Sequence, residues 1–556
     1  MKVSTLFRHW VRHCVLLLVI FGAVTTAAKP VSSVNIETAN IADLQAAFAD
    51  GSLTSVKLVR AYMKRIDAYD KQGPTINTVI TFNSKALDEA KKCDAERKAG
   101  KSRGPLHGIP IVLKDNYNTF DMPTTAGSSM LKGNIPPDDA FVVKKLRAAG
   151  AIILAKVNMS EFASGGGSVG GAKDPAVLKA GAIPNGYSSM GGQTRNPHAL
   201  DRGPSGSSGG TGAAIAAVFA QFGLGTDTAS SVRGPSSVNG IVGLKPTTGL
   251  MSRDGIVPLS LSLDTGGPMA RSVYDIAVAL NVMAGVDAAD AMTANSAGHV
   301  EKDYTAFLKK GALSRVRIGI ARDFDGKDPA VDAVFSDALE NLRKLGAVTI
   351  DFKYPSFMLE GRAGAFNTVM QSDFKAQIAE YLQKNTGPGY PKTLDDLVRI
   401  ANDPASGYPS PEKAFALKYS ASVALSLDDP VYLAAKKEGF AMVKAAVDAV
   451  MKKYQLDVIV YLSSPTGPAP IVPPANPRPT DPTAQAFNIS NMSGYPDLVV
   501  PAGMTTTGLP VTISFLGPEF SDGKLLGYGY EFEQATHALH LPKYTPALPS
   551  DIVSKH

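Results

Sequence analysis

The chain has 556 residues, of which 44% are hydrophobic and 19% are charged, a composition typical of a globular protein with a large buried core. Its formal net charge is +6, but Lys2, Arg8 and Arg12 contribute three of these charges, and the rest of the chain carries 53 basic against 50 acidic residues. So small a surplus argues against nucleic acid and acidic membrane surfaces as partners.

The first 28 residues have the pattern of a signal peptide. A basic start is followed by an apolar run at residues 14–24 and then by the small residues TTAA. This run is shorter than the ~20 residues that a membrane-spanning helix needs. We therefore expect cleavage before Lys29 and a secreted or periplasmic protein without stable membrane insertion; an uncleaved N-terminal anchor is the alternative. Cleavage would leave Cys93 as the one thiol, so no intramolecular disulfide is expected.

Helical and strand patterns alternate over the first part of the mature chain. The predicted elements are amphipathic helices within 40–70 and 83–99, a strand at 109–113, and, within 139–162, a helix, a turn at Gly150 and a strand at 151–157. Residues 163–210 are rich in Gly, Ser and Pro and predict a long loop region, which is usually functional or disordered.

The same alternation continues to the end of the chain. The predicted elements are a helix of small residues at 209–225, strands at 312–322, 456–465 and 509–517, and a mostly helical cap or insertion at about 330–455. The Pro-rich tract 465–482 is a loop, because strand and helix patterns resume after it. We therefore predict one large α/β domain over 29–556, with a central mixed β-sheet surrounded by α-helices.

Two possible site patterns fail on their context. Residues 206–210 fit GxSxG around Ser208, but a nucleophile elbow needs a strand before it, and here a long loop precedes the serine. His537 and His540 share a helix-like spacing without a third ligand nearby. We expect neither a metal nor any other cofactor.

Lys114 stands at the end of the predicted strand 109–113. Burial disfavours the charged form of an amine and lowers its pKa. A neutral amine accepts protons, which a serine nucleophile requires where no histidine is near. An isolated lysine in such a place more often extends its amine to the surface, so the role of Lys114 depends on the rest of the pattern.

That further pattern lies within residues 191–258. The run SGSSGG is followed downstream by SSVR. This stretch resembles the amidase signature family, whose core is a run GGSSGG and a later serine followed by a β-branched residue and often Arg. The upstream GPLHGIPIVLKDNYNT and the downstream SLDTGGPMARSVYD and NMSGYPDLVVPAG extend the resemblance over nearly the whole mature chain.

The resemblance implies a catalytic triad of two serines and a lysine. Lys114, in VLKDN, matches the catalytic lysine of the family. Ser207, the first serine of SSGG, matches a bridging serine that follows a cis peptide bond, and Ser231, before VR, matches the acyl-accepting nucleophile. We therefore expect Ser231 to attack an amide carbonyl while its proton passes through Ser207 to neutral Lys114.

The resemblance also implies an oxyanion hole made by the backbone N–H groups of Thr228, Ala229, Ser230 and Ser231. The usual family text is Thr-Gly-Gly-Ser, and this chain has Thr-Ala-Ser-Ser. Ala229 or Ser230 would be strained if its position required a positive φ. We expect a loop that accepts ordinary residues, because only its N–H groups are needed. Ser205, which replaces a glycine of PGGSSGG, is the milder departure.

Further residues match recurrent positions of the family. Asp227, Ser208 and Arg233 are expected to hold the loops by hydrogen bonds, and a purely structural role and an indirect catalytic role both remain open. Lys156 and Lys245 are also similar to family lysines. We interpret both as scaffold, because neither matches the KDN position.

The function implied is that of an exported amidase that cleaves a small-molecule carboxamide to a carboxylate and ammonia or an amine through an acyl-serine. One alternative is ester, aryl-amide or cyclic-amide hydrolysis by the same triad. A second is a subunit of a glutamine-dependent amidotransferase, and a third is an inactive homologue that serves as a binding protein. No nucleic acid is expected as a partner, and a homodimer is left open.

Overall fold

The computed structural model describes residues 33–163, 183–472, 483, 485–486 and 488–554. The predicted signal peptide and its cleavage site lie outside these residues, as do parts of the predicted loop regions 163–210 and 465–482. None of the helices in the described ranges combines the length and the apolar character that crossing a bilayer requires.

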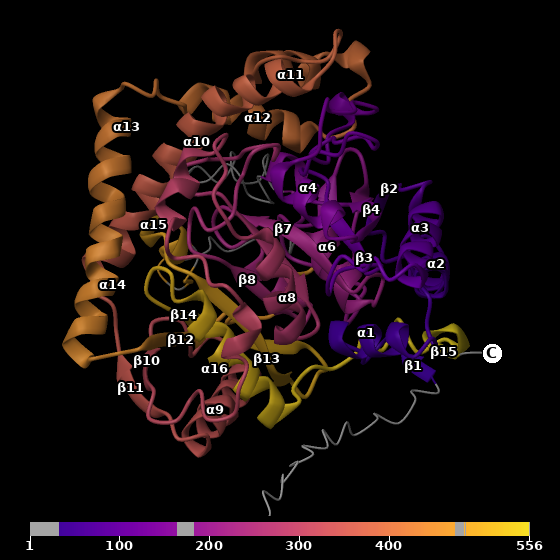
Figure 1. Ribbon diagram of the computed structural model, residues 1–556. Helices are drawn as coiled ribbons and strands as arrows, with labels where there is room; N and C mark the ends of the chain where they lie inside the picture. Colours follow the sequence, from indigo (N-terminus) through magenta and orange to yellow (C-terminus); the bar gives the residue numbers. More distant parts are fainter. Residues whose placement is uncertain (1–32, 164–182, 473–482, 484, 487, 555–556) are drawn as a thin grey trace, which may run out of the picture.

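A mixed sheet of 11 strands runs through the molecule, with helices around it (Figure 1). From one edge to the other its strands are β11 (Val348–Phe352), β10 (Arg317–Ala321), β12 (Val458–Leu462), β14 (Pro510–Leu516), β13 (Asp497–Met504), β8 (Val242–Lys245), β9 (Thr265–Ala270), β7 (Phe222–Asp227), β3 (Pro110–Lys114), β4 (Ile152–Val157) and β2 (Val79–Phe82). This arrangement confirms the α/β class and the mixed sheet predicted from the sequence.

Parallel strands lie in two groups within this sheet. Strand β10 pairs in parallel with β11 and β12, and β3 pairs in parallel with β4 and β7, whereas the other neighbours are antiparallel. Two small antiparallel sheets are separate: β1 (Ser33–Asn35) pairs with β15 (Ile552–Ser554), and β5 (Tyr187–Ser188) with β6 (Gly192–Gln193).

Most of the helices flank the sheet or form a layer beyond it. They are α1 (Ile41–Ala49), α2 (Ser55–Tyr69), α3 (Ala86–Lys98), α4 (Phe141–Ala148), α6 (Gly209–Ala216), α7 (Arg233–Val238), α8 (Val273–Met283), α9 (Pro329–Lys344), α10 (Ser356–Asn385), α11 (Leu394–Asn402), α12 (Pro411–Val423), α13 (Pro430–Ala434), α14 (Phe440–Tyr454), α15 (Ile489–Ser493) and α16 (Asp522–Thr536). Local sequence starts several of them: the side chains of Asn40, Thr54, Ser272 and Asp328 accept backbone N–H groups of the first turn.

Helices α7 and α16 cover opposite faces of β13. Leu498 and Val500 lie against Gly529 of α16, whereas Asp497, one residue before Leu498, contacts Arg233 of α7. Helix α6 packs beside α7, and α8 and α9 pack beside α16. The glycine-rich helix α6 lies close to the strands because Gly210 leaves no room for a side chain against the backbone of Asn158.

The predicted helix at 209–225 is wrong in its second half. Helix α6 ends at Ala216, and β7 begins at Phe222. A strand buried on both faces has an unbroken apolar sequence, which cannot be told from a buried helix by periodicity. The correction matters because β7 carries Thr226 and Asp227 to the candidate site.

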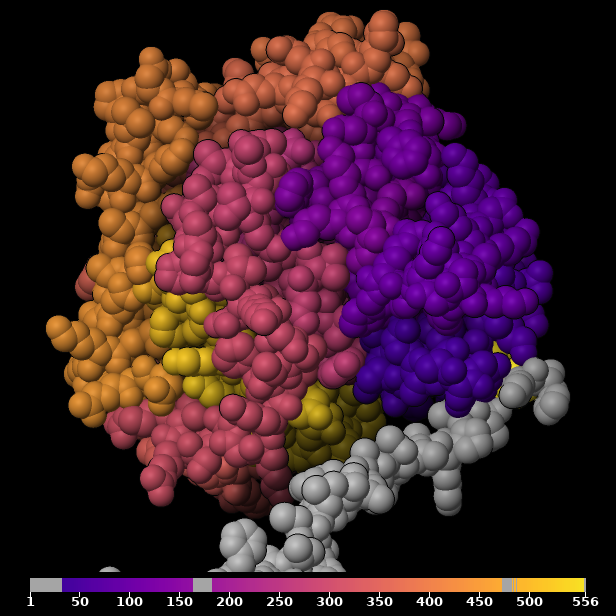
Figure 2. Space-filling view, viewed as in Figure 1, coloured from indigo at the N-terminus to yellow at the C-terminus, as the bar shows by residue number. Residues whose placement is uncertain are grey.

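The segment predicted as a cap is divided by the structure. Strand β11 forms one edge of the central sheet and α9 packs against β13 and β14, so both belong to the sheet layers. Helices α10 to α14 form an outer layer, drawn in coral to orange along two sides of the molecule (Figures 1 and 2). Phe374 and Ile378 of α10 share a buried cluster with Leu131 and Phe162, which anchors this layer to the segments that follow β3 and β4.

Candidate active site

Lys114 is the last residue of β3 and is completely buried. Its Nζ atom lies 2.7 Å from Oγ of Ser207 and 2.7 Å from Oγ1 of Thr226 in the parallel neighbour β7. The amide of Asn116 donates to the same Thr226 oxygen at 3.1 Å. The site therefore lies at the carboxyl ends of two parallel strands, where α/β folds commonly bind ligands.

Burial lowers the pKa of Lys114 from 10.5 to about 7, although the carboxylates of Asp264 and Asp227 act in the opposite direction. None of the described carboxylates forms an ion pair with this lysine. The amine is therefore available in its neutral form near neutral pH.

Ser207 follows a cis peptide bond from Gly206, as the family resemblance implies. Its carbonyl accepts the N–H of Ser160 at 3.0 Å, and the hydroxyl of the next residue, Ser208, bonds to the backbone of Thr226 at 3.2 Å. These contacts fix the Ser207 side chain beside Lys114. They also place Ser208 as a support of the loop and leave no role for it as the serine of a nucleophile elbow.

Ser231 precedes α7 and is 8% exposed. Its carbonyl accepts the N–H of Ser208 at 3.2 Å, which ties the loop of Ser231 to the loop of Ser207. Among the described residues, no hydrogen bond joins the two hydroxyl groups of Ser207 and Ser231. The structure thus shows the expected contact between Lys114 and Ser207. The backbone hydrogen bond between Ser208 and Ser231 holds the loop of Ser231 next to this pair.

The N–H groups of the four expected oxyanion-hole residues, Thr228, Ala229, Ser230 and Ser231, have no acceptor within the described part of the chain. The carbonyl of Ala229 accepts the Arg233 guanidinium at 2.7 Å and the N–H of Asn488 at 2.7 Å. Because a trans peptide points its C=O and N–H in opposite directions, these bonds turn the N–H of Ser230 away from Arg233. Unpaired N–H groups in this arrangement can stabilise an oxyanion.

Backbone strain is absent from Ala229 and Ser230 and present at Ser205. Neither Ala229 nor Ser230 is among the described residues with a positive φ, whereas Ser205 has a φ of 61°. The loop thus accepts ordinary residues at both positions where the family text has glycine. Ser205 was interpreted as the milder departure from the family sequence. It is nevertheless the one residue of the three whose backbone lies in the left-handed region.

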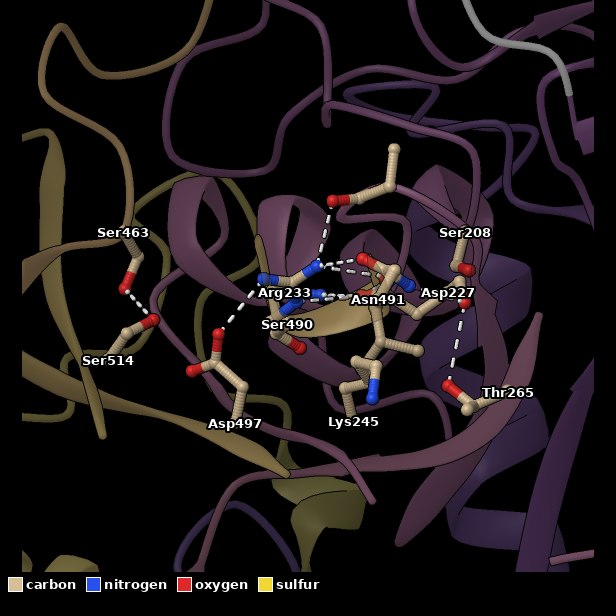
Figure 3. Close-up of polar contacts among 12 residues, drawn as sticks. Ser208, Asp227, Arg233, Lys245, Thr265, Ser463, Ser490, Asn491, Asp497 and Ser514 are labelled. Atoms are coloured by element: carbon tan, nitrogen blue, oxygen red, sulfur yellow. Dashed lines mark hydrogen bonds and ion pairs between the residues drawn. The ribbon is translucent and has the colours of Figure 1, made fainter. Parts of the chain in front are cut away.

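Arg233 is the centre of a buried network beneath the loop (Figure 3). It bonds Asp227 through Nε and Nη2, both at 3.1 Å, and Asp497 through Nη1 at 2.9 Å. Asp227 also accepts the N–H groups of Val232 and Arg233. Burial alone raises the pKa of Asp227, but Arg233 and these donors lower it to about 2. The carboxylate therefore stays charged and holds the turn that carries Ser231.

Sequence reasoning missed two members of this network, Asn491 and Asp497. The Asn491 amide donates to the carbonyl and the carboxylate of Asp227 at 3.1 and 3.0 Å, and its oxygen accepts Arg233 at 2.7 Å. The hydroxyl of Tyr461 donates to Asp497. Both residues lie inside the stretch NMSGYPDLVVPAG, whose family resemblance was the only sequence signal that they belong to the site. No local pattern links them to Arg233.

Asp264 was missed as well and is joined to residues 228–231, which form the oxyanion loop. Its carboxylate accepts the Thr228 hydroxyl and the N–H groups of Leu259 and Ser260, at 2.9 and 3.0 Å. Burial raises the pKa of Asp264 to about 6 although these donors act against it.

The two other family-like lysines have structural contacts. Lys156 pairs with Asp115, with 3.3 Å between Nζ and Oδ1, and donates to Thr124. Lys245 donates to the carbonyls of Pro246 and Tyr495, and burial lowers its pKa to about 8. Neither contacts Ser207 or Ser231 among the described residues. In the same ranges, no group of three or more His, Cys, Asp or Glu side chains could hold a metal ion.

Comparison with known proteins gives one family and several solved structures. The profile of the family described as Amidase matches residues 57–526. A glutamyl-tRNA(Gln) amidotransferase subunit of Thermoanaerobacter pseudethanolicus is 33% identical over 490 residues, which cover 87% of this chain and 93% of that protein. The corresponding subunit of Pseudomonas aeruginosa is 33% identical, and the match covers 89% of this chain and 97% of that protein.

Among solved structures, the native peptide amidase of Stenotrophomonas maltophilia superposes with a TM-score of 0.81 at 37% identity. The match covers 91% of this chain and 99% of that one. The glutamyl-tRNA(Gln) amidotransferase subunit of Thermotoga maritima superposes with a TM-score of 0.68 at 25% identity, over 92% of this chain and 99% of that one.

Proposed function

The chain belongs to the amidase family, the enzymes of the amidase signature, and is an amide-hydrolysing enzyme; from this premise we propose that it hydrolyses linear carboxamides, peptide amides first among them, through an acyl-enzyme on Ser231. The observation that carries the proposal is the 2.7 Å contact between Ser207 and Lys114, an amine whose pKa burial lowers to about 7, so that much of it is neutral near pH 7.

In the acylation step, Ser231 Oγ forms a bond to the carbonyl carbon of the substrate. Its proton passes to Ser207, whose own proton passes to the lone pair of Lys114 Nζ. The negative charge on the substrate oxygen is stabilised by the free N–H groups of residues 228–231. This step needs a Ser231–Ser207 hydrogen bond that forms with substrate present, since catalytic contacts often tighten in the complex.

Collapse of this intermediate breaks the C–N bond, and the proton on Lys114 returns through Ser207 to the departing nitrogen. The products of this half are ammonia, or an amine, and an ester of Ser231. Water then attacks the ester, gives its proton to Lys114 by the same path, and releases the carboxylate while Ser231 regains its hydroxyl proton. The cycle consumes one water and leaves the enzyme unchanged.

The preference for peptide amides is supported by the stronger structural match. The peptide amidase superposes at a TM-score of 0.81 and 37% identity, against 0.68 and 25% for the amidotransferase protein. The sequence similarity to amidotransferase subunits, at 33% identity, favours a second candidate, in which the chain releases ammonia from glutamine for a partner protein. Ester, aryl-amide and cyclic-amide hydrolysis by the same residues remain as further alternatives, whereas membership of the amidase family argues against an inactive binding protein.

Ammonia release separates these functions. We expect the purified chain alone to release ammonia from a dipeptide amide, and Ser231→Ala to abolish the release. Ser336→Ala, which changes an exposed serine of α9, serves as the matched control and should behave as wild type. Turnover of glutamine but not of the peptide amide would favour the second candidate, and no turnover of any amide or ester would favour the binding protein.

We also propose that the protein is exported. The support is the sequence of the first 28 residues: the basic start, the apolar run at 14–24 and the small residues before Lys29. Fractionation of the source cells and sequencing of the N-terminus are expected to find a chain that starts near Lys29 outside the cytoplasm. A full-length chain in the cytoplasm would refute the proposal.

A further inference from the structure

Residues 259–264 form a short segment between the oxyanion loop and the outer helical layer. Its own turn is closed by the N–H groups of Leu263 and Asp264, which bond to the carbonyl of Ser260 at 2.8 and 2.7 Å. Ser260 is completely buried, so its polar groups depend on protein partners. The segment has partners on both sides.

On the side of the active site, Asp264 joins the segment to the oxyanion loop. One carboxylate oxygen accepts the Thr228 hydroxyl, and the other accepts the N–H groups of Leu259 and Ser260. Thr228 is the residue before Ala229, whose N–H is free. The position of Asp264 therefore sets the direction in which the oxyanion loop leaves β7.

On the side of the outer layer, α10 holds the segment by two side chains. Oδ2 of Asp373 accepts the Ser260 hydroxyl at 2.6 Å and the N–H of Ser262 at 3.3 Å. Gln377, one turn later, accepts the N–H of Leu261 at 2.7 Å. The other oxygen of Asp373 accepts the hydroxyl of Tyr432 in α13 at 2.7 Å. Donors from the segment and from α13 thus converge on two neighbouring side chains of α10.

We propose that Asp264 and Asp373 are positioning residues for the amidase reaction, and that residues 259–264 transmit the position of α10 to the oxyanion loop. The proposal rests on the proposed function. Neither carboxylate is assigned a contact with substrate; each acts through the hydrogen bonds described. If either buried carboxylate moved, the groups that donate to it would lose their hydrogen bonds. The contacts with Asp264 and Asp373 therefore favour one position of residues 259–264.

The test compares variants at the end of the segment remote from the active site. Ser260→Ala removes one hydroxyl from Asp373, and Asp373→Ala removes the acceptor. Asp373→Asn keeps one oxygen for Ser260 and Ser262 and can donate to Tyr432, so it is the conservative variant. Asp428→Asn, at an exposed carboxylate between α12 and α13, is the matched control.

Loss of one oxyanion donor typically costs ~100-fold or more in rate, and we expect a displaced donor to cost about tenfold. Accordingly, kcat for a peptide amide should fall about tenfold in Ser260→Ala and further in Asp373→Ala, with KM changed less than about threefold. Asp373→Asn should recover most of the rate. Each kcat is calculated per active site that a fluorophosphonate labels, so that unfolded protein does not lower the value.

A second readout is independent of turnover. Amide hydrogen exchange in the peptide that contains Thr228 and Ser231 should be faster in Ser260→Ala than in wild type or Asp428→Asn. A kcat of Ser260→Ala within twofold of wild type, on an enzyme that does hydrolyse the amide, would overturn the positioning role. Absence of amide turnover in the wild type would instead overturn the proposed function, and the exchange result would then decide whether the segment still orders the loop.

Discussion

Lys114 and Lys156 occupy neighbouring parallel strands, and both are completely buried. The register places Leu113 opposite Lys156, so the side chain of Lys114 projects to the other face of the sheet. Lys156 meets a carboxylate, Asp115, at 3.3 Å. Lys114 meets the hydroxyl groups of Ser207 and Thr226, each at 2.7 Å.

The two lysines have different partners and therefore different roles. Burial lowers the pKa of both lysines, but for Lys156 the adjacent Asp115 opposes the shift directly. For Lys114 the carboxylates of Asp264 and Asp227 act from beyond hydrogen-bond distance, and the pKa falls to about 7. Lys114, which has no ion pair and lies beside a serine hydroxyl, can therefore act as a base, whereas Lys156, paired with Asp115, is a structural element.

The largest expected effect is on activity at Lys114. Lys114→Met keeps the length of the side chain and removes the base, so kcat should fall ~10²–10⁴-fold, the usual contribution of a general base. The melting temperature should stay the same or rise, because the substitution removes a buried amine that has no ion pair. Steady-state kinetics and calorimetry check both. If the Lys114→Met variant retained half of the wild-type kcat, Lys114 would not be the catalytic base.

The opposite result is expected at Lys156. Lys156→Met leaves Asp115 buried without its counter-ion, which typically costs ~3–5 kcal/mol of unfolding free energy. Urea denaturation measures this loss, and kcat per folded molecule should change little. The double variant Asp115→Asn/Lys156→Met removes both charges and should recover much of the stability. If the single and double variants are equally unstable, the ion pair is not the reason for the burial of Lys156.

The pH dependence gives a smaller effect with a definite sign. The reaction needs neutral Lys114, so kcat/KM should rise about tenfold per pH unit below pH 7 and level off above it. Stability should also rise with pH between 7 and 10.5, because over this range the unfolded chain binds a proton that the folded chain has lost. Lys114→Met should remove the contribution of Lys114 to this rise and leave the contributions of Lys156 and Lys245, whose pKa values burial also lowers.

Ser205 contacts neither lysine, so its substitution is a reference for the effects expected at Lys114 and Lys156. Its φ of 61° is costly for serine and easy for glycine, by about 1 kcal/mol. Ser205→Gly should therefore be neutral or slightly stabilising, because the flexibility gained by the unfolded chain offsets part of the relief. Thermal unfolding measures the shift. A clear destabilisation would mean that the serine hydroxyl makes a contact worth more than the backbone strain.

Five of the 11 strands of the central sheet, β3, β4, β10, β12 and β14, were predicted, because periodicity and length agree there, and the other six were not. The strands ending at Lys114 and Val157 and the strands β12 and β14 stand as short apolar runs between turn signals. The strand β7 was missed because its apolar residues continue those of α6 without a break. The bend between them depends on packing that involves β3 and β9, which no local pattern shows.

The candidate site divides in the same way. Lys114, Ser207 and Ser231 could be placed from local motifs, and the structure joins the first two directly. Asp497 and Asn491 could not, because each lies more than 250 positions along the chain from Arg233, and only the sheet order brings β13 beside β8. Long-range contacts of this kind depend on tertiary structure and leave no signal in residue spacing.

The identity of the nucleophile and of its base is tested most directly by a fluorophosphonate probe, with peptide mapping and with the labelling rate followed against pH. We expect a label on Ser231, a rate that rises through about pH 7, and loss of the label in Lys114→Met but not in Lys156→Met. A label on another residue, or equally fast labelling in Lys114→Met, would contradict the assignment of Ser231 as nucleophile and Lys114 as its base.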